Sequence, residues 1–219
     1  MIPAKLRYEI RTMFENSGTE EFNINRKTGS LNVNALSSYG QTDRLFKRRT
    51  ETAGIDSAVC IVLDCSGSMG DEPERMANAV QVAYALIDTL SQAGVPTAVV
   101  TFNHTVSVFK PWNMPAKKTK GLLECVVTQG STNDYAAVQF AHGMLLRRPE
   151  ARRVCFVLTD GEGEPDATRA QCESGTRLGI TTIGIGILQP VAHVYPNAVR
   201  VDNVNDLGTV AFTKLKLAA

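Results

Sequence analysis

Oxygen-bearing side chains gather in three short stretches of the sequence, each directly before a predicted helix. Carboxylates and hydroxyls without a histidine or a thiolate are hard ligands, which suit Mg²⁺, with Mn²⁺ or Ca²⁺ as alternatives, and disfavour zinc and copper. Three such stretches at one edge of a fold could together hold a divalent cation. They are Asp64, Ser66 and Ser68; Ser131, Thr132 and Asp134; and Thr159, Asp160 and Glu162.

A cation in such a site would keep part of its coordination shell free for another molecule. Mg²⁺ takes about six oxygen ligands and retains some of its waters when a protein binds it. A site that supplies few protein oxygens therefore leaves a position open to an outside ligand. An acidic residue of a partner protein suits that position, so the three stretches predict a metal-dependent binding site.

The first stretch follows a predicted strand over residues 58–64. This run is apolar and rich in β-branched residues, as expected of a strand buried on both faces, and it ends in Asp64. Over residues 71–92 apolar side chains recur at helical spacing. The turn between the two elements lies at the carboxyl end of a strand and the amino end of a helix, where open parallel sheets bind ligands.

The rest of the main domain alternates strands with helices. Residues 96–102 and 105–109 predict two strands joined at Asn103-His104, a hairpin that adds an antiparallel edge. The pattern predicts an α/β fold with a doubly wound, mostly parallel sheet and one antiparallel edge strand. Further helices are expected over 116–127, 134–147, 166–178 and 205–217, and further strands over 153–159, 180–187 and 199–201.

A small amino-terminal extension, residues 1–54, precedes the main domain of residues 55–219. Apolar residues at helical spacing predict a short helix over 3–16. Residues 21–24 and 30–33 resemble a small hairpin around a polar turn, and a further extended stretch is expected at 45–47. The extension is thus expected to hold a helix and a hairpin, with the domain boundary near Gly54.

Composition narrows the classes of partner and compartment. A net charge of +1 and short basic clusters give no reason to expect nucleic acid or an anionic membrane as partner. No apolar run approaches the roughly 20 residues of a membrane helix, and no leader pattern begins the chain, so we expect a cytoplasmic protein. The five cysteines are odd in number and never spaced C-x-x-C, which favours free thiols. Only Cys65 lies where a helix amino terminus could lower its pKa.

The ligand residues resemble a known family. Asp64-Cys65-Ser66-Gly67-Ser68 is similar to the D-x-S-x-S signature of the von Willebrand factor A (VWA) domain, whose metal-ion-dependent adhesion site binds Mg²⁺ and an acidic residue of a partner protein. Gly130-Ser131-Thr132 and Thr159-Asp160-Gly161 match its later motifs in order. The resemblance implies that Ser66, Ser68 and Thr132 contact the metal directly, and that Asp64 and Asp160 do so directly or through water.

A narrower resemblance extends over most of the chain, to the carboxy-terminal part of the CobT subunit of aerobic cobaltochelatase. It implies a partner, a ring-forming AAA+ ATPase of the MoxR or CobS type, and a role as non-catalytic subunit or adaptor, with cobalt chelation as one pathway. The residues that carry it are Gly29-Ser30-Leu31, Leu36, Phe46-Lys47-Arg48, Ala141-His142, Leu145-Leu146, Arg148-Pro149-Glu150, Arg152-Arg153, Asp160-Gly161 and Ile183-Gly184-Ile185-Gly186.

Other interpretations stay open beside these. Serine or aspartate before a helix can cap free backbone N–H groups without any metal, although a cap explains one hydroxyl rather than two and a carboxylate. For Asp134, a favourable charge at a helix amino terminus is the alternative to an outer-shell metal role. The enzyme alternative is a Mg²⁺-dependent phosphatase or phosphotransferase using Asp64. No phosphate loop of the G-x-x-x-x-G-K-[ST] type occurs, and His142 is expected to be packed inside the fold.

Overall fold

The computed structural model describes residues 19–28, 30–33, 42, 44–52, 56–123, 126–161 and 163–202. The described residues divide into two compact units between Asp56 and Ser57, and each unit is described by itself. The helices predicted over 3–16 and 205–217 lie outside the described residues, as do Glu162 and Cys125.

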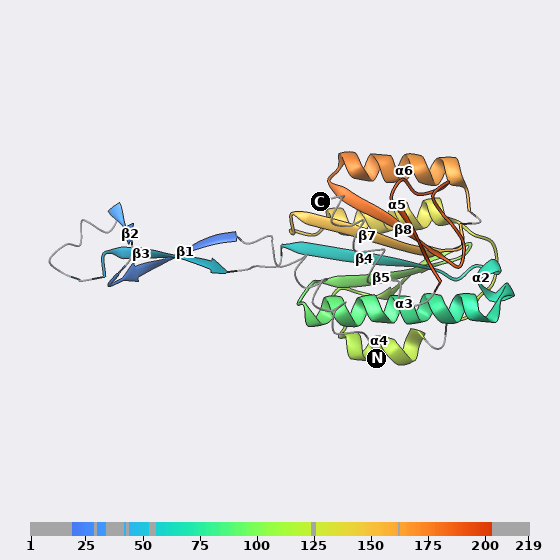
Figure 1. The fold of residues 1–219 in the computed structure, drawn as a ribbon, viewed down its shortest axis with the longest axis horizontal. Coiled ribbons are helices and arrows are strands. Elements are labelled where there is room, and N and C mark those ends of the chain that lie inside the picture. The colour runs from blue at the N-terminus through green and yellow to red at the C-terminus, as the bar shows by residue number, and fades with distance from the viewer. Residues whose placement is uncertain are drawn as a thin grey trace. The chain divides into compact units, whose positions relative to one another are not determined.

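A sheet of six strands forms the centre of the larger unit (Figure 1). Its order is β6-β5-β4-β7-β8-β9, and all neighbours run parallel except β5 and β6, which are antiparallel. The doubly wound, mostly parallel sheet with one antiparallel edge strand is confirmed. The strands are β4 (Ser57–Asp64), β5 (Thr97–Phe102), β6 (Val106–Lys110), β7 (Arg152–Thr159), β8 (Ile180–Ile187) and β9 (Ala198–Val201).

Helices cover both faces of this sheet (Figure 1). The helices α3 (Pro73–Gln92) and α4 (Ala116–Leu123) lie on one face, and α5 (Asp134–Leu146) and α6 (Pro165–Arg177) lie on the other. Every residue of β4 is buried, because the strand has a helix layer on each side. Alternate residues of β4, β5 and β7 form one hydrophobic cluster with the inner face of α5.

The helix predicted over 71–92 is α3, which begins at Pro73 and ends at Gln92 as expected. A single turn, α2 (Ser68–Asp71), is followed by α3, and Glu72 between them is extended, with φ −111° and ψ 116°. Pro73 accounts for the break, since the ring of a proline disfavours the helical conformation in the residue before it. The first ligand stretch therefore runs directly into a helical turn that begins at Ser68.

The prediction of a helix over 116–127 is wrong at the carboxyl-terminal end. The helix α4 ends at Leu123, and Val126 and Val127 lie in an irregular segment. Both are β-branched, and the segment that follows bonds to another part of the chain: the Gln129 N–H donates to the Cys65 carbonyl oxygen at 3.0 Å. This contact draws the second ligand stretch toward the first.

The smaller unit contains a three-stranded antiparallel sheet. Its strands are β1 (Thr19–Arg26), β2 (Ser30–Leu31) and β3 (Phe46–Thr52), in the order β1-β3-β2. The predicted hairpin is therefore wrong, because β1 and β2 both pair with β3 and not with each other. The reason lies in strand length, since β2 has two residues and β3 offers seven.

Among the described residues, no helix is both long enough and apolar enough to cross a bilayer.

Candidate metal centre

The ligand stretches meet where the winding of the sheet changes direction. The chain leaves β4 toward β5 on one side, whereas β7 pairs with β4 on the other. Helices from the two halves lie on opposite faces, so the carboxyl ends of β4 and β7 flank the crevice at which doubly wound sheets bind ligands. Asp64 is the last residue of β4, and Thr159 is the last residue of β7.

Asp64 is buried, and hydrogen-bond donors hold both of its carboxylate oxygens. The Ser66 N–H donates to Oδ1 at 2.9 Å, and the Thr159 hydroxyl donates to Oδ2 at 2.6 Å. Burial raises the pKa of Asp64 to about 6, and the hydrogen bonds from Thr159 and Ser66 oppose the rise. The nearby Asp160 carboxylate raises this pKa further, and a cation bound beside Asp64 would lower it.

The two serines of the signature lie side by side. Their hydroxyl oxygens are 3.1 Å apart, and Ser66 is buried while Ser68 is partly exposed. A helix cap does not explain this pair: the N-cap position of α2 is Gly67, and the two serine hydroxyls contact each other. Two hydroxyls presented together beside a buried carboxylate are the oxygen donors that a hard cation requires.

Asp160 comes from the third stretch and is paired with an arginine. The Arg75 guanidinium donates to Asp160 Oδ2 at 3.0 Å and to the Ser68 carbonyl oxygen at 2.9 Å. Both side chains are buried, with exposed fractions of 6% for Arg75 and 0% for Asp160. A second nitrogen of Arg75 lies 3.2 Å from Glu72. Arg75 thus fixes the third stretch to the first.

Thr132 lies in a loop that is anchored on either side of it. The Gly67 N–H donates to the Gly130 carbonyl oxygen at 2.9 Å, and the Asn133 N–H donates to the Asn103 carbonyl oxygen at 3.1 Å. The Asn133 side chain also accepts from the Ala136 N–H at 3.2 Å and so caps α5. The second stretch is held against the first by backbone bonds, and Thr132, which is partly exposed, stays a predicted ligand.

Asp134 connects the second stretch to the third. Its Oδ1 accepts from the Tyr135 N–H at 2.9 Å and from the Glu164 N–H at 3.2 Å. The side chain is buried, and burial raises its pKa. A Cβ on Gly163 would lie 2.3 Å from the Asp134 carboxylate carbon, so only glycine fits there. This carboxylate binds the loop before α6, a role that neither the dipole interpretation nor the outer-shell interpretation anticipated.

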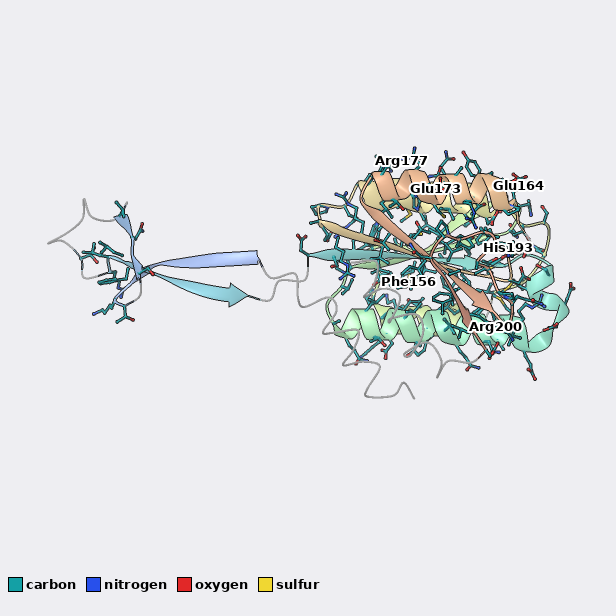
Figure 2. The ribbon with its side chains drawn as sticks, turned by 45° about the horizontal axis from the view of Figure 1, so that its top comes forward. Phe156, Glu164, Glu173, Arg177, His193 and Arg200 are labelled. Carbon is teal, nitrogen blue, oxygen red and sulfur yellow. The ribbon has the colours of Figure 1, made fainter. Side chains whose placement is uncertain are left out.

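Sequence reasoning missed three neighbours of the site: Arg75, Tyr195 and His193. The Tyr195 hydroxyl lies 3.5 Å from Asp134 Oδ2, and a Cβ on Gly184 would come within 2.4 Å of the Tyr195 ring, so that glycine makes room for it. His193 Nε2 lies 3.3 Å from the Gly161 carbonyl oxygen. Figure 2 shows His193 and Glu164 toward the end of the sheet where α2 lies, with Arg177 toward the other end.

The remaining candidate side chains are structural. Cys65 has a pKa raised to about 12 by burial and by the Asp64 charge, so the expected lowering by a helix terminus is wrong. Cys60 and Cys155 are buried inside strands, as expected, and the described cysteines are free thiols. His142 is packed, also as expected, and lies 2.8 Å from the Thr182 hydroxyl and 3.2 Å from the Gln171 amide.

The donor set fits a hard cation. Within the described ranges, no three His, Cys, Asp or Glu side chains gather into a group that could hold a metal. The candidate donors are hydroxyls and two carboxylates, which suit Mg²⁺ and Mn²⁺ and not zinc. The residues that would hold it are Asp64, Ser66, Ser68, Thr132 and Asp160.

The fold and this edge define a class of protein, and comparison with known families agrees. The sequence model of the von Willebrand factor type A domain matches residues 59–162, which span β4 to the third ligand stretch. The six-stranded unit therefore resembles a VWA domain in fold and, over residues 59–162, in sequence.

Solved structures show the same fold. An aerotolerance-related membrane protein from Bacteroides fragilis is 20% identical with a TM-score of 0.61, over 72% of this chain and 97% of that one. BatB from Bacteroides thetaiotaomicron is 19% identical with a TM-score of 0.60, over 74% and 98%. The manganese-loaded TRAP protein of Plasmodium vivax is 16% identical with a TM-score of 0.60, over 74% and 73%. At these identities the likeness concerns the fold alone.

Proposed function

We propose that the VWA domain of this chain is a divalent-cation-dependent protein-binding module. The bound ion would be held by Asp64, Ser66, Ser68, Thr132 and Asp160 and would offer an open coordination position to an acidic residue of the partner. Mg²⁺ is the proposed ion, because the donors are hydroxyls and carboxylates. The manganese-loaded state of the TRAP protein, a structural neighbour, supports a divalent cation at this fold.

One observation carries the proposal. The Ser66 and Ser68 hydroxyls lie 3.1 Å apart beside a carboxylate, Asp64, that is itself fixed by Thr159 at 2.6 Å. Nothing in the fold requires two hydroxyls beside a buried acid at this edge, and burying the Asp64 carboxylate without a cation is costly. An ion that binds there makes this arrangement favourable.

The residue pattern favours binding over phosphoryl transfer. Ser66 stands two residues after Asp64, where a phosphotransferase that used this aspartate would carry a second aspartate. Hydrolysis of a phosphomonoester by the isolated protein with Mg²⁺, lost in Asp64→Asn, would instead support the enzyme alternative.

The proposed partner is an AAA+ ATPase of the MoxR or CobS type, with this chain as its adaptor or subunit. Support comes from the sequence resemblance to the CobT subunit and from the absence of a phosphate-binding loop in the sequence. On this proposal the ATPase supplies the energy and the VWA domain selects the target. Cobalt chelation is one pathway in which such a pair would act.

A pull-down with a purified MoxR-type ATPase tests this function. Wild type should bind with Mg²⁺ and release in EDTA, and Ser68→Ala should bind weakly, because it removes one neutral donor and keeps both carboxylates. Ser107→Ala, an exposed serine on β6, is the matched control and should bind like wild type. Complex formation that is indifferent to EDTA and to Ser68→Ala would overturn the metal-bridged mechanism.

A further inference from the structure

A cavity of about 380 Å³ lies at the other end of the sheet, remote from the ligand stretches. It is lined by the end of α3, the start of β5, the last residue of β6 and the segment that leads into α4. Its volume lies within the range of about 300–1,000 Å³ that is usual for small-molecule sites. The proposed function makes no use of it.

Lys110 is the residue of this cavity that could bind a charged ligand. Its side chain is buried, with the residue 4% exposed, and its ammonium donates to the Thr97 carbonyl oxygen. An ammonium carries three N–H donors, and this carbonyl is its one acceptor among the described residues. No carboxylate in the described part of the chain forms an ion pair with it. A buried cation without a counter-ion is unfavourable, and a bound anion would supply both the charge and the missing acceptors.

The rest of the lining adds a flat apolar wall and the amino end of a helix. Arg148 is the second cation, its guanidinium carbon 5.1 Å from the centre of the Trp112 ring, and Glu150 holds it through a hydrogen bond of 2.9 Å. The residues described as lining the cavity include no acid. Ala116, the first residue of α4, also lines it, so the positive end of a helix dipole faces the space. Ile87 and Val95 provide aliphatic surface.

We propose that this cavity binds a small organic anion, with a carboxylate or phosphate group against Lys110 and a planar apolar body beside Trp112. One ammonium with unused donors selects an oxyanion over a neutral group. The aromatic and aliphatic walls select a ligand with an apolar body over a bare inorganic ion. The site is independent of the metal centre, so it would add a second ligand to the protein-binding module.

Tryptophan fluorescence tests the proposal directly, because Trp112 is the only tryptophan in the chain. The probes are phenylacetate, phenyl phosphate and the uncharged phenylacetamide. Either anion should change the Trp112 emission saturably, and the amide should bind at least about tenfold more weakly than phenylacetate. Tighter binding of phenyl phosphate would identify the head group as phosphate, and tighter binding of phenylacetate would identify it as carboxylate.

Variants locate the anion. Lys110→Met keeps the length of the side chain and removes its charge, so the preference for phenylacetate over the amide should disappear. Lys118→Met, an exposed lysine of α4, should keep that preference. If Lys110→Met does not fold, the affinities of wild type for phenylacetate and for phenylacetamide still test the proposal. Equal affinity for the two, retention of the preference in Lys110→Met, or no saturable response to either anion up to about 10 mM would overturn the proposal.

Discussion

The two ends of the central sheet bury charges of opposite sign in different ways. At the carboxyl end, Asp64 and Asp160 are packed among donors: the Thr159 hydroxyl, the Ser66 N–H and the Arg75 guanidinium. At the amino end, Lys110 has one carbonyl acceptor and faces a cavity of about 380 Å³. The acidic end is filled and its oxygens are held in place, whereas the basic end is hollow and short of acceptors.

This difference indicates which kind of ligand each end of the sheet can bind. Oxygens fixed in advance lose little freedom when a small cation arrives, so the acidic end is suited to an ion. A lone ammonium beside an open apolar wall is suited to a larger molecule that brings its own acceptors. On these proposals the same sheet presents an ion site and a small-molecule site, and substitutions at each end test whether the contrast is real.

The largest effect is expected from Arg75→Met at the acidic end. The change leaves the buried Asp160 without its cation, and breaking a buried pair in this way costs about 3–5 kcal/mol of stability. Added Mg²⁺ should restore more stability to the variant than it adds to wild type, because the ion replaces the lost charge. Urea unfolding with and without Mg²⁺ measures both. A loss below about 1 kcal/mol would mean that the Arg75–Asp160 pair contributes no more than a surface ion pair does.

The next largest effect is expected at His142, which is buried in its neutral form, and this effect on stability depends on pH. Burial lowers the pKa of His142 from 6.5 to about 4. The unfolded chain therefore binds a proton that the folded chain refuses, so stability present above about pH 6.5 is lost as pH falls toward about 4, by about 3 kcal/mol at most. His142→Gln should flatten this part of the curve of unfolding free energy against pH. A curve of unchanged slope would contradict a buried neutral imidazole.

The strands, and the polar residues at their carboxyl ends, could be predicted from the sequence for a physical reason. A strand covered by helices on both sides must be apolar throughout, and β4 and β7 show this without long-range information. The residues at their carboxyl ends follow directly, so Asp64, Thr159 and Asp160 were found from local pattern alone. The break at Glu72 was missed although Pro73 is a local signal, because the helical spacing continues across it.

Contacts between distant segments could not be predicted in the same way. Arg75 lies 85 residues from Asp160, and an arginine in the first turns of an amphipathic helix ordinarily faces solvent. Tyr195 lies 61 residues from Asp134 and reaches it only because Gly184 leaves space for its ring. The pairing of β1 and β2 with β3 likewise depends on a strand that follows later in the chain.

A smaller effect is expected from Ser68→Ala at the acidic end. The hydroxyl is partly exposed and its contact with Ser66 is worth about 1 kcal/mol, so the metal-free fold should persist. The stabilisation produced by Mg²⁺ should shrink, since a neutral donor is lost. Thermal unfolding at increasing Mg²⁺ gives both quantities. A variant with full Mg²⁺ stabilisation would remove Ser68 from the set of ligands.

The smallest effect is expected from Lys110→Met at the basic end, and there the contrast between the ends is sharpest. Removing a buried cation that lacks a counter-ion leaves no charge unpaired, so the free energy of unfolding should change by less than about 1 kcal/mol. Denaturant unfolding of the variant checks this. A loss as large as that of Arg75→Met would mean that the ammonium is as firmly paired as the acids are.

Binding of Mn²⁺ to the metal-free protein, followed by calorimetry, tests the central claim most directly. Wild type should bind one ion per chain, and Mg²⁺ should compete for it. Asp64→Asn should weaken binding at least about tenfold, because it removes the buried carboxylate while keeping its shape. Asp88→Asn, the same change on the outer part of α3, should bind like wild type. Equal Mn²⁺ affinity in wild type and Asp64→Asn would contradict a metal centre at this edge of the sheet.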